Sequence, residues 1–205
     1  HLDTLFTPSQ PAERAAWLAR QGLEPQGYVV FMPGGRAEAS RVRADNAFTL
    51  QEWETARDYC REYLAQYAEG SDRDAIGLKL GQSLVELKDW AGAAAALREV
   101  LARAPKGETE FRARLLLARA LAAQGEAAAA DQEITLLKSE SELYSAQGEV
   151  ALAEGENLLA QGKDADAAPL LENVPPEWLK TPAVKARVAD LLGRVYYRQW
   201  KLEDA

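Results

Sequence analysis

The stretch that decides the fold is residues 80–105, LGQSLVELKDWAGAAAALREVLARAP. It contains two apolar patterns of helical period, one that includes the small residue Gly81 and one that begins at Trp90. Asp89 is a typical N-cap residue between the two patterns, and Pro105 ends the second. The stretch therefore predicts two helices joined by a tight turn, at Asp74–Leu87 and Trp90–Ala104.

Small residues repeat along the chain with a period of 37 residues. One series is Ala56, Ala93, Ala130 and Ala167, with Ala205 one residue late. The other is Ala44, Gly81, Ala118 and Gly155, with Gly193 likewise one residue late. Such a period indicates stacked supersecondary units, because each helix pair buries its apolar face against its neighbours. We expect an all-α array of antiparallel helix pairs at residues 36–205. The expected units are 37–72, 74–107, 111–144, 148–180 and an incomplete 186–205, which ends inside its second helix.

Polar and glycine-containing segments mark the ends of the predicted helices. Thr49–Glu52 has the capping-box pattern and predicts a helix start near Leu50, whereas Gln124–Glu126 and Gln161–Lys163 each centre on a glycine that suits a left-handed turn. Thr181-Pro182 predicts the start of the fifth unit. Pro169 lies inside the second helix of the fourth unit, which predicts that this helix is short or kinked.

Residues 1–35 do not follow the repeat and are expected to form an N-terminal cap segment. Ala12–Gln21 predicts one helix, and the apolar run Gly27–Gly35 predicts an extended segment that covers the open end of the first unit. A ligand loop or a lone strand is the alternative for this run. The chain begins at His1, which favours a processed or recombinant fragment of a longer protein.

Composition narrows the classes of partner. The net charge is −8 and the pI is near 4.9, so the surface as a whole repels phosphate, and nucleic acid is not expected as a partner. No apolar run approaches the roughly 18 residues that a membrane-spanning helix needs. The single cysteine, Cys60, excludes an intrachain disulfide, and we expect it to be a buried packing thiol.

Catalytic and metal-binding patterns are not apparent. His1 is the only histidine, which excludes Ser/His/Asp and Cys/His arrangements within the repeats. Gly155…Gly162-Lys163 has the wrong spacing for a phosphate loop, and Asp164-Ala-Asp166 lacks the glycine of a calcium loop. The pairs Glu154/Glu156 and Glu140/Glu142 are expected to be solvated charges. We therefore expect no catalytic residue, no metal and no cofactor.

The repeat pattern resembles the tetratricopeptide repeat. In the second unit the resemblance consists of Leu80-Gly81-x-x-Leu84, Trp90-x-x-Ala93, Leu97-x-x-Val100 and Pro105. It implies a right-handed superhelical solenoid in which facing small residues allow the paired helices to approach closely. It also places Trp53, Trp90, Tyr196 and Leu202 at helix-packing positions. The units are about three residues longer than usual, as in bacterial envelope proteins of the family, so a cell-envelope or a cytoplasmic location is left open.

The resemblance implies a protein or peptide partner, bound in a concave groove by the first helix of each unit. The implied groove residues are Gln82, Glu86, Arg112, Leu115, Arg119, Arg187, Arg194, Tyr197 and Arg198. The helical spacing of Arg187, Arg194 and Arg198 predicts a local basic face, suited to carboxylates; a solvated face paired with Asp or Glu is the alternative. We expect an interaction scaffold. The alternatives are a regulatory or targeting domain of a larger enzyme, and a structural spacer that self-associates.

Overall fold

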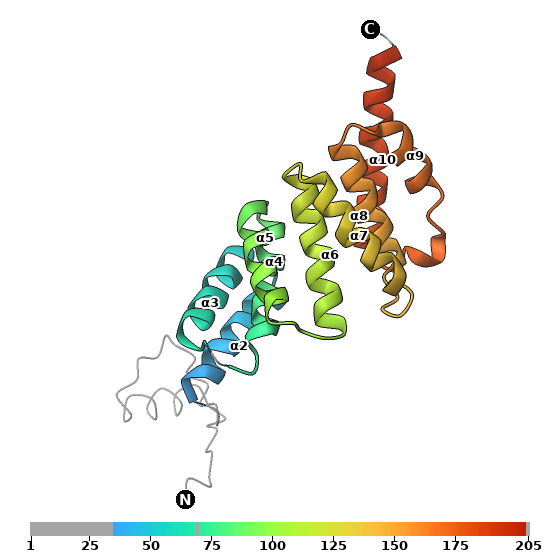
Figure 1. Ribbon diagram of the computed structural model, residues 1–205. Coiled ribbons are helices and arrows are strands. Elements are labelled where there is room, and N and C mark those ends of the chain that lie inside the picture. Colours follow the sequence, from blue (N-terminus) through green and yellow to red (C-terminus); the bar gives the residue numbers. More distant parts are fainter. Residues whose placement is uncertain (1–34, 69, 204–205) are drawn as a thin grey trace, which may run out of the picture. The chain divides into compact units, whose positions relative to one another are not determined.

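The computed structural model describes residues 35–68 and 70–203 of the chain (Figure 1). The chain divides into two compact units, residues 1–39 and 40–205. Only residues 35–39 of the first unit are described, as the first residues of a helix. The expected helix Ala12–Gln21, and all but the last residue of Gly27–Gly35, lie outside the described residues.

The described residues are helical throughout, with short connections and no strand, which confirms the predicted all-α fold. Nine α-helices and one 3-10 helix fall within these ranges. They are α2 (Gly35–Thr49), α3 (Trp53–Gln66), α4 (Arg73–Glu86), α5 (Trp90–Ala102), α6 (Glu108–Ala123), α7 (Ala127–Glu140), α8 (Gln147–Ala160), α9 (Asp164–Glu172), η1 (Pro176–Trp178) and α10 (Pro182–Glu203).

The helices pack in the order in which they occur in the sequence, as a tetratricopeptide-like solenoid does (Figure 1). From α3 to α10 each helix contacts the next one along the chain. In addition, α4 contacts α6, α6 contacts α8, and α8 contacts α10. The first helices of successive pairs therefore form one continuous row, and this row positions the candidate site.

The second unit has the predicted pair of helices, α4 and α5. Asp89 caps α5, because its Oδ1 accepts a hydrogen bond from the backbone N–H of Gly92 at 3.0 Å. A Cβ atom added to Gly81 would lie 2.4 Å from Cδ2 of Leu97, so the large side chain of α5 sits directly on this glycine. The expectation that small residues face each other was incomplete, since at Gly81 the close approach is made by a leucine.

The turn inside each unit repeats with the same period as the small residues. Gln51, Lys88, Gly125 and Gly162 lie 37 residues apart, and all four have a positive φ, between 59° and 80°. The glycine turns of the third and fourth units are thereby confirmed. The capping box at Thr49–Glu52 was wrong: Thr49 ends α2 and donates its hydroxyl to the carbonyl of Asp45, and α3 begins at Trp53 without a side-chain cap.

Two clusters of buried side chains form the core of the later units. One lies among α6, α7 and α8 and includes Phe111, Leu115, Ile134 and Val150. The other lies among α8, α9 and α10 and includes Leu171 and Val195. Each cluster joins a helix pair to the first helix of the next unit, which is how units that cannot fold alone stabilise one another.

The fourth and fifth units depart from the regular pair. As Pro169 predicted, α9 is short, at nine residues, and η1 follows it. Thr181 caps α10 by accepting the backbone N–H of Val184 on its hydroxyl. The expected second helix of the fifth unit is not found, because α10 continues without a turn to Glu203.

Tyr196 also differs from its predicted place in the core. Its side chain is 48% exposed, and its hydroxyl donates a hydrogen bond to Glu172. The reason is that no second helix follows α10 within the described residues to cover it. Trp53 and Trp90 are half-buried, and Leu202 is a residue whose side chain is not described. Across the described helices, none combines the length and the apolar character needed to cross a bilayer.

Candidate functional site

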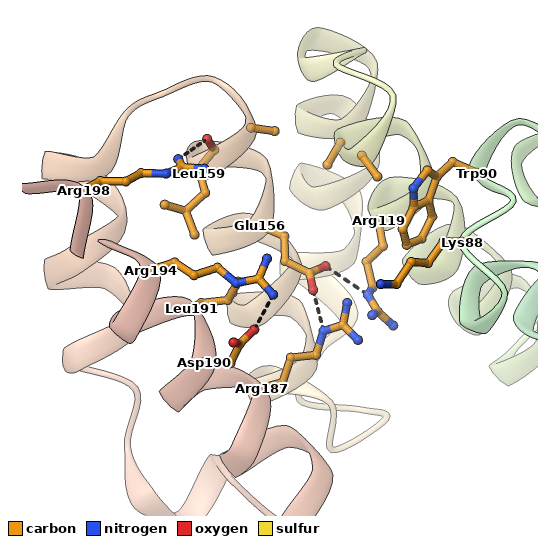
Figure 2. A pocket seen from close by; sticks show the side chains of 13 residues that line it. Lys88, Trp90, Arg119, Glu156, Leu159, Arg187, Asp190, Leu191, Arg194 and Arg198 are labelled. Carbon is orange, nitrogen blue, oxygen red and sulfur yellow. Dashed lines mark hydrogen bonds and ion pairs between the residues drawn. The ribbon is translucent and has the colours of Figure 1, made fainter. Parts of the chain in front are cut away.

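A cavity with a volume of about 380 Å³ opens on the row of first helices (Figure 2). Its walls come from α6, α8 and α10 and from the turn between α4 and α5. The lining residues are Lys88, Trp90, Arg119, Ala122, Ala123, Glu156, Leu159, Ala160, Arg187, Asp190, Leu191, Arg194 and Arg198. The wall therefore combines five cationic side chains, two carboxylates and an apolar portion.

Glu156 is the central charge of this cavity (Figure 2). Its Oε2 accepts Nε of Arg119 at 3.0 Å, and its Oε1 accepts Nε of Arg187 at 2.6 Å. The side chains of Glu156 and Arg119 are each only 14% exposed. One carboxylate of α8 thus joins α6 to α10, and its low exposure strengthens both charge-assisted bonds relative to a surface pair.

This bridge is part of a regular pattern of charges along the first helices. Arg119 and Glu156 lie 37 residues apart, and so do Arg112 and Glu149, whose Nη1 and Oε2 atoms are 2.5 Å apart. The two arginines lie on α6 and the two glutamates at the equivalent positions of α8. Ion pairs at equivalent positions of successive helices fix the register of one unit on the next.

The other arginines of α10 also have acidic partners. Nη2 of Arg194 lies 2.8 Å from Oδ2 of Asp190, one turn earlier on the same helix. Nη1 of Arg198 lies 3.3 Å from Oδ1 of Asp164 and the same distance from the carbonyl oxygen of Leu159. Arg194 and Arg198 are half-exposed or more, with side-chain exposures of 63% and 50%. Their guanidinium groups are therefore paired with acidic side chains and still accessible to solvent.

The structure brings four of the nine implied groove residues into one cavity: Arg119, Arg187, Arg194 and Arg198. Gln82, Glu86, Arg112 and Tyr197 do not line it. Leu115 is a core residue, 4% exposed, because its side chain packs with Phe111 and Ile134 between helices. Each of the three arginines of α10 is paired with an acidic side chain, which agrees with the alternative of a paired face, and the wall keeps an excess of cationic side chains over carboxylates.

Reasoning from the sequence missed Lys88, Trp90 and Glu156. Glu156 was expected to be a solvated charge, and that expectation was wrong, because the two neighbouring helices each bring an arginine to it. The 37-residue period could have identified it, since Glu156 occupies in α8 the position of Arg119 in α6. Lys88 and Trp90 carry no such signal, because Lys88 belongs to a turn and Trp90 begins a second helix, so neither lies in the row of first helices.

Cys60 and possible metal ligands were the other candidates for chemistry outside the cavity. Burial raises the pKa of the Cys60 thiol to about 12, which keeps it protonated and unreactive at neutral pH and confirms a packing role. Among the described residues, no group of three or more His, Cys, Asp and Glu side chains is arranged to hold a metal ion.

Comparison with known proteins relates one part of this array to a known repeat family. The tetratricopeptide repeat family matches residues 74–107, which run from the second residue of α4 through α5 to the residue before α6. The chain contains a tetratricopeptide repeat. This accounts for the pairing of α4 with α5 and for the glycine beneath Leu97, and the repeat supports a general role in protein–protein interaction.

Two solved structures share the tetratricopeptide-like fold over most of the chain. A mutant form of MamA is 15% identical, with a TM-score of 0.52, and the match covers 83% of this chain and 91% of that one. MamA MSR-1 is 14% identical, with a TM-score of 0.53 and coverages of 83% and 90%. At these identities the likeness concerns the fold. No match was found among the curated proteins.

Proposed function

We propose that this chain is an interaction scaffold that binds a peptide or a segment of a partner protein in the cavity on its first helices. The observation that supports the proposal is the convergence of Arg119, Arg187, Arg194 and Arg198 on one cavity. These residues come from α6 and α10, which are separated by three helices in the sequence. Concave sites with an apolar wall and a few convergent polar groups are the usual places where ligands bind.

The test is a pull-down from an extract of the source organism with the wild-type chain and the double variant Arg194→Glu/Arg198→Glu. Both side chains are exposed, so the variant is expected to fold and to lose the partner. The matched control is Arg98→Glu/Arg103→Glu, which reverses two exposed arginines near the second helix of a pair. Equal recovery of the partner by both variants would mean that the cavity does not bind the partner.

A regulatory or targeting domain of a larger enzyme is compatible with the same cavity. It differs in where the partner comes from, because a segment of the same full-length protein would then occupy the site. The structural alternative predicts self-association, which light scattering over a concentration series measures. A chain that stays monomeric while it binds a partner would favour the scaffold.

A further inference from the structure

The cavity has the opposite charge to the chain that carries it. Its wall holds five cationic side chains against two carboxylates, whereas the whole chain carries a net charge of −8. Positive charge concentrated in a recess attracts anions selectively, because the surrounding acidic surface repels them elsewhere. The first step of the inference is that the ligand brings negative charge.

One donor in the wall has no acceptor. Nη2 of Arg119 is buried and makes no hydrogen bond with any part of the chain that the structure describes. Its neighbour Nε is bonded to Glu156, so the guanidinium is held in place with one N–H edge still unsatisfied. Buried polar atoms are nearly always paired, and a ligand acceptor brought into the adjoining cavity would satisfy this one.

Glu156 indicates which kind of anion the arginines suit. The guanidinium groups of Arg119 and Arg187 each donate to a different oxygen of the same carboxylate (Figure 2). Each of them uses only its Nε for this contact, so the Nη groups remain for a second planar carboxylate. Arginine pairs with such groups through parallel N–H bonds, and this matched geometry favours a carboxylate.

Lys88 and the apolar wall supply the remaining contacts. Lys88 has a φ of 60° at the turn position where the third and fourth units have glycine, and the other non-glycine residue in this series, Gln51, does not line the cavity. The positive φ belongs to the turn that these four units share, and at Lys88 this turn places the side chain in the cavity wall. Trp90 lies beside Lys88, and Ala122 and Ala123 offer a small apolar surface (Figure 2).

We infer that the cavity binds an acidic peptide segment, with a carboxylate on Arg119, Arg187 and Lys88 and an adjacent aliphatic side chain on Trp90 and Ala122. This inference rests on the proposed function and adds the chemistry of the partner. The carboxylate comes either from an Asp or Glu side chain or from the end of the partner chain, and the two sources present the same planar group.

The experiment measures fluorescence anisotropy with labelled peptides of Gly and Ser that carry Glu-Leu pairs. A second peptide has Gln for each Glu, and both have an amidated C-terminus; a third is the Gln peptide with a free C-terminus. We expect the Glu peptide to bind at least about tenfold more tightly than the amidated Gln peptide, with an affinity that falls as salt rises. Tight binding of the third peptide alone would assign the carboxylate to a chain end.

The matched variants are Arg119→Gln and Arg112→Gln. Both arginines lie on α6 and pair with a glutamate 37 residues later, but only Arg119 lines the cavity. We expect Arg119→Gln to abolish the preference for Glu over Gln and Arg112→Gln to keep it. Loss of the preference in both variants would overturn the inference, and so would a wild type that binds neither carboxylate-bearing peptide more tightly than the amidated Gln peptide.

A second pair of variants serves if Arg119→Gln does not fold. Lys88→Gly and Gln51→Gly both place glycine at a positive φ, so each relieves backbone strain. Only Lys88→Gly is expected to lower the affinity for the Glu peptide, by severalfold. Equal affinities of the two variants for this peptide would contradict the role of Lys88. If partner recovery depends on Arg194 and Arg198 but no peptide shows a carboxylate preference, this inference fails while the proposed function stands.

Discussion

Gly81 on α4 and Gly193 on α10 occupy the same place in the repeat but have opposite surroundings. A Cβ atom added to Gly81 would lie 2.4 Å from Leu97, and one added to Gly155 on α8 would lie 2.6 Å from Leu171. A Cβ atom added to Gly193 would meet nothing within 4 Å among the described residues. The comparison teaches that a small residue at this position is required by the close approach of a crossing helix. The helix that carries the position does not require it.

The same contrast extends to the aromatic residues near Gly193. Tyr196, Tyr197 and Trp200 are all large and exposed, with Trp200 60% exposed. In the second unit the corresponding region of α4 is covered by α5, and its large apolar residues, such as Leu84, are buried. The two regions thus share a sequence pattern and differ in whether a second helix covers it.

The largest effect is expected when the covering side chain is removed. Leu97→Ala deletes a fully buried side chain that rests on Gly81, and we expect it to lower the free energy of unfolding by about 3 kcal/mol. Tyr196→Ala on α10 should cost under about 0.5 kcal/mol, because that side chain is exposed. Urea unfolding followed by circular dichroism measures both, and equal losses would contradict the distinction between covered and open regions.

Substitutions at the two glycines should differ in sign. Gly81→Val forces Leu97 to move in a packed interface, with an expected cost of about 2 kcal/mol. Gly193→Ala adds a methyl group in open space on an exposed helix and should raise stability by about 0.5–1 kcal/mol. Thermal unfolding gives the sign directly, and a destabilised Gly193→Ala would mean that α10 is covered in solution.

Alkaline pH compares a thiol buried on α3, Cys60, with the exposed hydroxyl of Tyr196 on α10, because the pKa values of the two groups are raised for different reasons. Burial raises the pKa of Cys60 from 9.0 to about 12, so an unfolded thiol ionises where the folded one does not. Below pH 9 the thiol is protonated in both states and does not change the free energy of unfolding. Between pH 9 and pH 12 only the unfolded thiol ionises, so the free energy of unfolding falls by about 1.4 kcal/mol for each pH unit.

On α10 the pKa of the Tyr196 hydroxyl is also raised, but its cause is the hydrogen bond to Glu172. The contribution of that bond is likewise lost as pH rises above the ordinary value for tyrosine. The measurement is urea unfolding at pH 8 and pH 10 for the wild type, Cys60→Ala and Tyr196→Phe. Cys60→Ala should show the flatter pH dependence of the two variants, and a wild-type slope in Cys60→Ala would contradict the burial of the thiol.

Helix caps are present in both regions, and their removal is expected to give the smallest difference in stability between the two regions. Asp89→Ala before α5 and Thr181→Ala before α10 each remove a side-chain acceptor from a backbone N–H and should cost about 1 kcal/mol. Thr49→Ala serves as the control, because Thr49 caps no N–H and should cost less than either. If Thr49→Ala had the largest effect of the three, the assignment of the caps would be wrong.

Much of the fold could be predicted because its signals are local. Gly125 and Gly162 predict left-handed turns, and Asp89 predicts a helix cap. Pro169 predicts that the helix containing it is short. Each of these acts on its immediate neighbours in the chain, so spacing is sufficient to place it. Thr49–Glu52 misled for the same reason: a capping pattern is common, and here α2 continued through its first residue.

The candidate site was predictable only in part. The helical spacing of Arg187, Arg194 and Arg198 places them together on α10, and the structure finds all three at the cavity. The contribution of Lys88 depends on a turn that comes close to α6 only when the units are stacked. Spacing along one helix does not carry that information.

The sequence by itself determined the period, the helix pairs and the burial of residues such as Ala93 and Cys60, because these follow from side-chain size and from rules that act over one or two turns. Only the tertiary structure decided that Glu156 joins Arg119 to Arg187 and that no described side chain covers Gly193. The physical reason is that ion pairs and close packing depend on distances between separate helices. Those distances are set by the packing of whole units on one another and cannot be obtained from any single stretch of residues.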